Sequence, residues 1–227
     1  GLAVDNLRSA EIVTASGEVL VASATEHPDL FWAIRGAGSN FGVVTWMELA
    51  LHPLGPEVVM AVPVFPLEEA GRILRTFRDF SDDAPNPINP QAYVLSLPPD
   101  DDLPAELHDR PALAVQMLYA GDPDGADAAL HSIYEWGDPL LELGGRMTYV
   151  ASQNGFDAMF PKGWLYYWKS HLLPELSDEQ IDTIVEMAFD RPSPRAIINI
   201  WPLGGAIREV APTATPWWRR DARGRCQ

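Results

Sequence analysis

The chain has 227 residues, of which 47% are hydrophobic, and a formal net charge of −16. This hydrophobic content, with eight tryptophans, excludes a disordered chain, and the length allows one domain and part of another. The acidic charge argues against a nucleic-acid partner and against docking on an anionic membrane, because like charges repel. No apolar run in the sequence is long enough to span a bilayer. Cys226 is the single cysteine and cannot form an internal disulfide, so we expect a cytoplasmic location.

The first elements predicted along the chain are two strands joined by a tight turn. Apolar and polar residues roughly alternate in Ser9–Thr14 and in Glu18–Ser23. Gly17 lies between them, at a position where a hairpin needs a positive φ. A short helix is then predicted to begin at Pro28-Asp29, because proline suits the first helical turn and an acidic residue suits the positive end of the helix dipole.

Three glycines follow this helix. Gly36, Gly38 and Gly42 lie between a run of large apolar residues and a β-branched strand that begins at Val43. Glycine lets the backbone adopt φ > 0 or approach a ligand closely. The order helix, glycines, strand does not fit the dinucleotide fingerprint of doubly wound folds, and the Lys-Ser or Lys-Thr end of a phosphate loop is lacking. Two interpretations stay open: a tight connection, or a backbone cradle whose amides bind the adenylate or phosphate part of a cofactor.

A second domain is predicted to begin near Pro53, after a linker punctuated by prolines. Its strands are expected at Val58–Phe65, Gln91–Leu97, Ala112–Tyr119 and Ala196–Trp201, and its helices at Pro66–Phe80, Asp124–Trp136 and after the capping residue Ser177. Strands and helices in this order indicate an α+β fold with an antiparallel sheet covered by helices on one face.

Metal-binding and hydrolase patterns are lacking. Asp100-Asp101-Asp102 has neither the alternating oxygen ligands nor the closing glutamate of a calcium loop, and it is interpreted as a solvated turn. The histidines are far apart and there is one cysteine, so we expect no metal site. No Gly-x-Ser-x-Gly elbow is present.

An aromatic segment, Gly163–Ser170, contains four large rings and ends in a cation. On a strand, Tyr167, Lys169 and His171 would share one face, and we interpret that face as a substrate wall. The alternative is that the rings belong to the core, as is more usual for an aromatic strand. The catalytic residues are unknown from the sequence, because a tyrosine or lysine base needs a depressed pKa that sequence does not reveal.

The segment Asp29–Thr45, together with the run Gly1–Leu7 and the hairpin between them, resembles the FAD-linked oxidases related to berberine bridge enzyme, in the vanillyl-alcohol oxidase superfamily. The resemblance covers residues 1–50 almost end to end. It implies FAD as cofactor and the C-terminal part of a PCMH-type FAD-binding domain joined to a substrate domain. It also implies cofactor-binding roles for the following residues: Gly1, Leu2, Asp5, Gly36, Gly38, Ser39, Asn40, Gly42 and Val44.

The resemblance implies three parts: residues 1–52 as the end of the FAD-binding domain, 53–210 as the substrate-binding domain, and 211–227 as a truncated return segment. The family's first half of the FAD domain and its last segment, which holds a catalytic base, have no counterpart in the sequence. We therefore interpret the chain as a fragment that lacks its N-terminal half, and no covalent flavin attachment is assigned to any of its five histidines.

The function implied is that of an FAD-dependent oxidase. Such an enzyme moves a hydride from a small organic substrate, such as an alcohol, sugar or aromatic compound, to flavin N5, with oxygen as acceptor. The alternative is a catalytically inactive fragment that serves as a binding or assembly module. Exposed apolar surface would then favour self-association or a partner chain.

Overall fold

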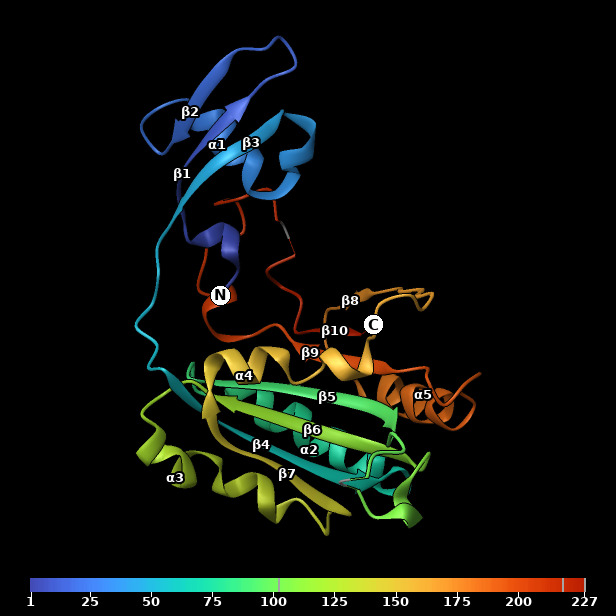
Figure 1. Cartoon of the computed structure of the whole chain (residues 1–227). Coiled ribbons are helices and arrows are strands. Elements are labelled where there is room, and N and C mark those ends of the chain that lie inside the picture. Colours follow the sequence, from blue (N-terminus) through green and yellow to red (C-terminus); the bar gives the residue numbers. More distant parts are fainter. Residues whose placement is uncertain (102, 218, 227) are drawn as a thin grey trace. The chain divides into compact units, whose positions relative to one another are not determined.

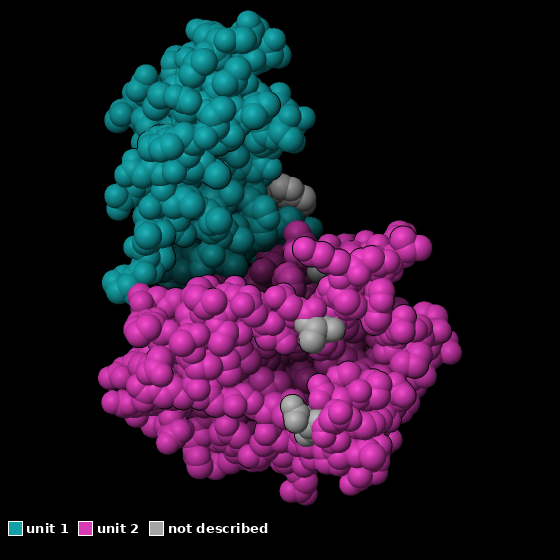
Figure 2. All heavy atoms as spheres, in the orientation of Figure 1, with its two compact units in different colours: residues 1–53, 205–221 teal, residues 54–204, 222–227 magenta. Residues whose placement is uncertain are grey.

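The computed structural model describes residues 1–101, 103–217 and 219–226, so Asp102 of the predicted solvated turn lies outside the described part. The chain divides into two compact units (Figure 2). Unit 1 contains residues 1–53 and 205–221, and unit 2 contains residues 54–204 and 222–227. The segment expected as one return element over 211–227 is thus shared between the units: its part up to residue 221 lies in unit 1, and the last strand lies in unit 2.

Unit 1 is built on a three-stranded antiparallel sheet. Its strands β1 (Leu7–Val13), β2 (Val19–Ser23) and β3 (Val43–Leu49) lie in the order β2-β1-β3. The predicted hairpin turn is present, and Gly17 has a φ of +83°. Helix α1 (Pro28–Ala37) packs on one face of this sheet, around the buried residues Ala10, Ile12, Ala22 and Phe31.

Unit 2 contains a seven-stranded antiparallel sheet in the order β7-β4-β6-β5-β9-β10-β8. Its strands are β4 (Glu57–Pro66), β5 (Ile88–Ser96), β6 (Pro111–Tyr119), β7 (Leu141–Thr148), β8 (His171–Leu173), β9 (Ile198–Pro202) and β10 (Gly224–Cys226). The four strands predicted for this domain correspond to β4, β5, β6 and β9. The strand β7 was not predicted, because the adjacent Gly144 and Gly145 interrupt its apolar pattern.

The main helices of unit 2 cover one face of this sheet. They are α2 (Ala70–Asp83), α3 (Ala126–Leu130) and α5 (Asp178–Phe189), and their buried apolar residues form one core with alternate residues of the central strands. The α+β architecture is therefore confirmed. The short helix α4 (Tyr149–Asn154) lies over the opposite face, so that face is partly covered as well (Figure 1).

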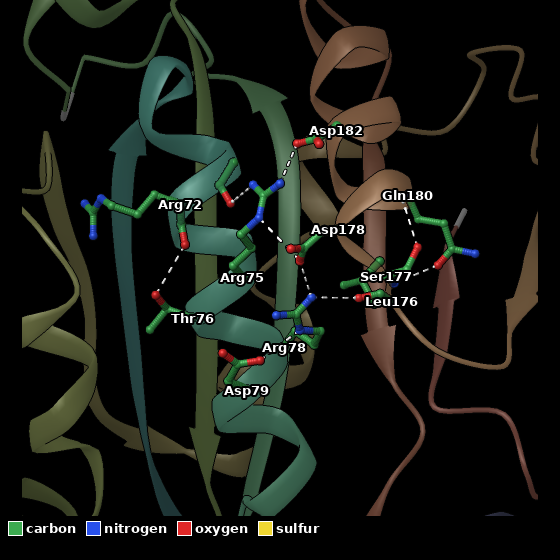
Figure 3. Close-up of polar contacts among 11 residues, drawn as sticks. Arg72, Arg75, Thr76, Arg78, Asp79, Leu176, Ser177, Asp178, Gln180 and Asp182 are labelled. Carbon is green, nitrogen blue, oxygen red and sulfur yellow. Dashed lines mark hydrogen bonds and ion pairs between the residues drawn. The ribbon is translucent and has the colours of Figure 1, made fainter.

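Helices α2 and α5 are joined by polar contacts at their exposed edge (Figure 3). Arg78 donates to Asp178 Oδ1 at 2.6 Å, and Arg75 donates to Asp182 Oδ1 at 2.6 Å. The predicted cap of α5 is confirmed, because the Ser177 side chain accepts from the Gln180 amide while the Gln180 side chain accepts from the Ser177 amide. These contacts fix the N-terminus of α5 against α2.

No helix in the described part of the chain is long and apolar enough to cross a membrane.

Candidate functional site

The three glycines of the predicted cradle have different structural roles. A Cβ on Gly36 would lie 2.7 Å from the Pro216 Cβ, so this glycine allows the 205–221 segment to pack against α1. Gly42 has a φ of +145°, and a Cβ there would lie 2.3 Å from the Val13 carbonyl oxygen. Gly38 is different, because the nearest atom to its Cβ position would be the Ile34 Cβ at 4.0 Å. A Cβ on Gly38 would therefore make only an ordinary van der Waals contact within unit 1.

Gly38, Ser39 and Asn40 form a single 3-10 turn between α1 and β3. The Ser39 and Asn40 side chains are exposed. The Val44 side chain, in contrast, packs against the small core of unit 1. Within the predicted cradle, the turn Gly38–Asn40 is thus the part whose backbone and side chains a ligand could reach.

The predicted N-terminal contributors Gly1 and Leu2 precede a 3-10 turn, Ala3–Asp5, which a buried ion pair anchors. Arg220 donates through Nη2 to Asp5 Oδ1 at 2.5 Å and through Nη1 to Asp5 Oδ2 at 3.0 Å. The Arg220 side chain is 1% exposed and that of Asp5 is 11% exposed. Both carboxylate oxygens of Asp5 are engaged inside unit 1, so this residue positions the turn.

Arg35 belongs to the same region of unit 1. Its guanidinium donates to the carbonyl oxygens of Phe31 and Ala214 and lies 4.3 Å from the centre of the Phe31 ring. Burial lowers the pKa of Arg35, and the nearby Asp5 carboxylate opposes that effect. Arg35 and Arg220 together hold the 205–221 segment against α1 and the N-terminal turn.

A second polar cluster lies on the face of the unit 2 sheet opposite α2. Gln91 faces Gln116 across β5 and β6, and Tyr93 faces Asn199 across β5 and β9. These side chains share one face because residues two apart in a strand point the same way. They form the floor of a cavity of about 460 Å³. Its walls are formed by α4, by the turn that follows α4, and by large apolar side chains from other parts of unit 2. The wall residues are Ser152, Gln153, Phe156, Met159, Phe160, Trp168, Ile197 and Trp201.

The polar atoms of this cavity, here called the sheet pocket, are unequally satisfied. The Tyr93 hydroxyl donates to Gln91 Oε1, and burial raises the pKa of Tyr93 to about 12, with the Trp201 side chain opposing that rise. Asn199 is 6% exposed, and its Oδ1 is buried with no hydrogen-bond partner among the described residues. The residues that line the pocket are uncharged at neutral pH. The pocket is therefore suited to a neutral polar ligand.

The predicted substrate wall has a different geometry from a strand face. Residues 163–170 are irregular, and a strand begins only at His171, which pairs with Cys226 of β10. The prediction that Tyr167, Lys169 and His171 share one strand face is therefore wrong. Tyr167 is 85% exposed, and Lys169 Nζ lies 5.7 Å from the centre of its ring.

A larger open cavity of about 910 Å³ lies beside the aromatic segment. Tyr167 and Trp164 line it, and the Arg195 guanidinium lies 4.0 Å from the centre of the Trp164 ring. The two cavities share four lining residues: Met159, Phe160, Trp168 and Ile197. The aromatic segment thus contributes Trp168 directly to the sheet pocket and places Tyr167 in the adjoining cavity.

Sequence reasoning missed the polar residues of the sheet pocket. Gln116 and Asn199 are single polar residues inside otherwise apolar strands, and such residues are buried on folding. A buried polar side chain needs a partner, so an isolated amide in an apolar strand is a signal that could have identified the pocket.

No group of three or more histidine, cysteine, aspartate or glutamate side chains within the described ranges could hold a metal ion.

Comparison with known proteins places these features in context. No family model matches the chain. An FAD-linked oxidoreductase from Dictyostelium discoideum is 28% identical over 212 residues, which is 92% of this chain and 44% of that protein. This relationship extends along nearly the whole sequence. The chain is thus similar to FAD-linked oxidoreductases.

Solved structures of an oligosaccharide oxidase and of a BBE-like protein share the fold. The xylooligosaccharide oxidase from Myceliophthora thermophila, solved in complex with xylobiose, is 22% identical with a TM-score of 0.78, over 100% of this chain and 50% of that one. A BBE-like protein from Arabidopsis thaliana is 24% identical with a TM-score of 0.77, over 100% of this chain and 47% of that one. The chain thus spans about half the length of these relatives.

Proposed function

We propose that this protein is an FAD-dependent oxidoreductase that acts on a small, neutral, hydroxylated substrate. The observation that carries the proposal is the 28% identity to an FAD-linked oxidoreductase along 92% of the chain. The relatives are about twice as long as this chain, so the activity of the whole protein is inferred from them.

The turn Gly38–Asn40 fits a role in holding FAD. Gly38 has a φ of −51°, which any residue adopts, so neither backbone conformation nor packing within unit 1 requires glycine there. Close approach of a ligand to the backbone is a remaining physical reason for the lack of a side chain. The exposed Ser39 hydroxyl and Asn40 amide add hydrogen-bonding groups next to it.

FAD, when bound, accepts a hydride from a substrate carbon. The residues of the sheet pocket would bind and orient that substrate. Tyr93 keeps its proton at neutral pH, since its pKa is about 12, so its hydroxyl is a hydrogen-bond donor and a poor general base. The uncharged lining favours an alcohol, sugar or neutral aromatic compound over an ion, because a buried charge without a partner is costly.

Tyr167 and Lys169 are proposed as an outer wall for the same substrate, since Tyr167 lines the cavity that adjoins the sheet pocket and Lys169 lies over its ring. His171 remains a predicted substrate residue without further support. The relatives' names favour the oxidoreductase over the inactive binding module. Self-association and a cytoplasmic location stay predictions.

The proposal is tested by the visible absorption of the purified chain, before and after FAD is added and the excess removed. We expect retained flavin bands, and we expect Gly38→Leu to retain at least roughly tenfold less flavin, because the new side chain would block the close approach of the cofactor to the turn. Gly55→Leu is the matched control, because a Cβ there makes only ordinary contacts. A colourless protein, or equal flavin retention in Gly38→Leu, would contradict the proposal.

A further inference from the structure

We infer that Asn199 selects the substrate: its side-chain carbonyl oxygen accepts a hydrogen bond from a hydroxyl group of a neutral ring compound in the sheet pocket. The inference rests on the proposed function only in taking this pocket as the substrate site. It assigns a specificity role to a residue that no sequence motif singled out.

The first observation is the unsatisfied oxygen of Asn199. The residue is 6% exposed, its strand is paired on both edges, and its Oδ1 has no partner among the described residues. Nearly all buried polar atoms in folded proteins are hydrogen-bonded, so a buried acceptor without a donor requires an explanation. Because Asn199 lines a cavity of about 460 Å³, a bound molecule can supply the missing donor.

The second observation is the set of neighbours that already satisfy one another. The Tyr93 hydroxyl, directly across the strand pair from Asn199, donates its proton to Gln91. A hydroxyl has one proton to donate, so the Tyr93 hydroxyl cannot donate to Asn199 Oδ1 at the same time. The Asn199 oxygen is thus an acceptor without a donor, and Trp201 Nε1, which lines the same pocket, is a buried donor without a partner among the described residues. An incoming hydroxyl can both donate to Asn199 Oδ1 and accept from another group.

The third observation concerns the chemistry of that group. An acceptor oxygen requires a donor, and a cationic donor would be buried among uncharged lining residues without a counter-ion. Trp201, Trp168 and Phe156 supply flat apolar walls. Rings pack against such walls while a hydroxyl gives direction. A neutral ring with a hydroxyl donor satisfies both requirements, and phenols and sugars share this chemistry.

The test uses pairs of probes that differ only in hydrogen-bond donors. One pair is 4-methylphenol and 4-methoxytoluene, and the other is methyl β-xylopyranoside and its fully O-methylated form. Titration calorimetry, or the fluorescence of the pocket tryptophans, measures each affinity in the full chain. We expect the wild-type protein to prefer the hydroxylated member of one pair by roughly tenfold, as one net hydrogen bond allows. The pair that shows the preference identifies the source of the hydroxyl as a phenol or a sugar.

Two variants separate selection from folding. Asn199→Leu removes the acceptor, and we expect the affinity ratio within the pair to fall to about one. Asn199→Asp keeps an acceptor oxygen at the same position and should retain a preference for the hydroxylated member. Ser81→Ala is the matched control, because Ser81 Oγ is also buried without a partner but lines a different cavity, beside Arg78 and Arg223. Its ratio should equal that of the wild type.

A wild-type ratio near one in both pairs, absence of binding by all four probes, or an unchanged ratio in Asn199→Leu would overturn the inference. Flavin retention is recorded separately for each sample. Intact probe selection in a protein that retains no FAD would refute the proposed function and leave the selection by Asn199 standing. Retained FAD without probe selection would refute the selection by Asn199 and leave the proposed function standing.

Discussion

Gly42 is required both by its backbone conformation and by its neighbours. Its φ of +145° is one that side chains rarely adopt, and its Cβ position is 2.3 Å from the Val13 carbonyl oxygen. Gly17 also has a positive φ, of +83°, but nothing lies within 4 Å of its Cβ position. A side chain at Gly17 would therefore cause backbone strain alone, whereas a side chain at Gly42 would cause both backbone strain and a steric conflict.

We predict that Gly42→Ala destabilises the protein by several kcal/mol, at least about 3, since β1 must move to admit the methyl group. Gly17→Ala is the control and should cost about 1–2 kcal/mol from backbone strain alone. Urea unfolding of both variants measures the difference. Equal losses would show that the close approach to Val13 is relieved without cost.

The ion pair between Asp5 and Arg220 is the most buried of the described ion pairs. We predict that Arg220→Met costs about 3–5 kcal/mol of unfolding free energy, because the Asp5 carboxylate is left buried without its partner. The double variant Asp5→Leu with Arg220→Met should recover most of the loss, since both charges are then removed.

Arg8→Met is the matched control for Arg220→Met. The Arg8 and Glu48 side chains are 63% and 50% exposed, so losing this ion pair should cost less than about 1 kcal/mol. Chemical denaturation compares the three variants. If Arg220→Met were as mild as Arg8→Met, the buried pair would not anchor the N-terminal turn.

At the scale of elements, the contacts between α2 and α5 make one contribution to stability pH-dependent. The Arg78 guanidinium, through its hydrogen bond, and the charge of Arg75 hold the pKa of Asp178 below its ordinary value of 3.8 (Figure 3). A carboxylate with a lowered pKa stabilises the folded state above its ordinary pKa, and this contribution is lost as the pH falls through the lowered value.

We therefore predict that the wild-type protein loses thermal stability more steeply below pH 4 than Asp178→Asn does, because the variant has no proton to bind at this position. Asp127→Asn, an exposed site in α3, should keep the wild-type slope. Melting temperatures measured between pH 5 and pH 2.5 give the two slopes. Parallel curves for the wild type and Asp178→Asn would contradict the assigned role of the Arg78 contact.

Sequence reasoning placed elements well where local pattern and core packing agree. The strand β6 is apolar except for Gln116, and α2 and α5 bury regular apolar stripes, so the periodicity of these elements predicts which of their residues are buried. The aromatic segment behaved differently. Its rings are typical of a strand, but no strand in the described part of the chain pairs with residues 163–170. Hydrogen-bond partners decide whether a strand forms more than propensity does.

At the scale of the whole molecule, the chain crosses between the units at residues 53/54, 204/205 and 221/222. Residues 50–56 form the first connection and lie outside the helices and strands, and Leu51 within it is 88% exposed. Leu165 in the aromatic segment is fully exposed as well. Such exposed irregular segments are preferred sites of proteolysis.

We predict that thermolysin, which cleaves before large apolar residues, cuts first at Leu51 or Leu54 and at Leu165. Mass spectrometry identifies the sites. After the first cut, residues 1–50 should co-elute with the remainder in gel filtration, because Trp32 donates to the Thr213 carbonyl oxygen and Arg220 pairs with Asp5 inside unit 1. Arg220→Met should release this fragment. An early cut inside β4–β6, or release from the nicked wild type, would contradict the division into units.

The sequence by itself determined the resemblance to FAD-linked oxidases, the α+β class, the hairpin, and the principal helices and strands of the sheet, because these depend on local periodicity, turn chemistry and a contiguous motif. It also drew attention to Gly38, but it could not separate that residue from Gly36 and Gly42. Only the tertiary structure showed that Pro216 and Val13 account for the other two. The sheet pocket also became visible only in the tertiary structure, because the strand register brings Gln91, Gln116 and Asn199 onto one face from distant parts of the chain.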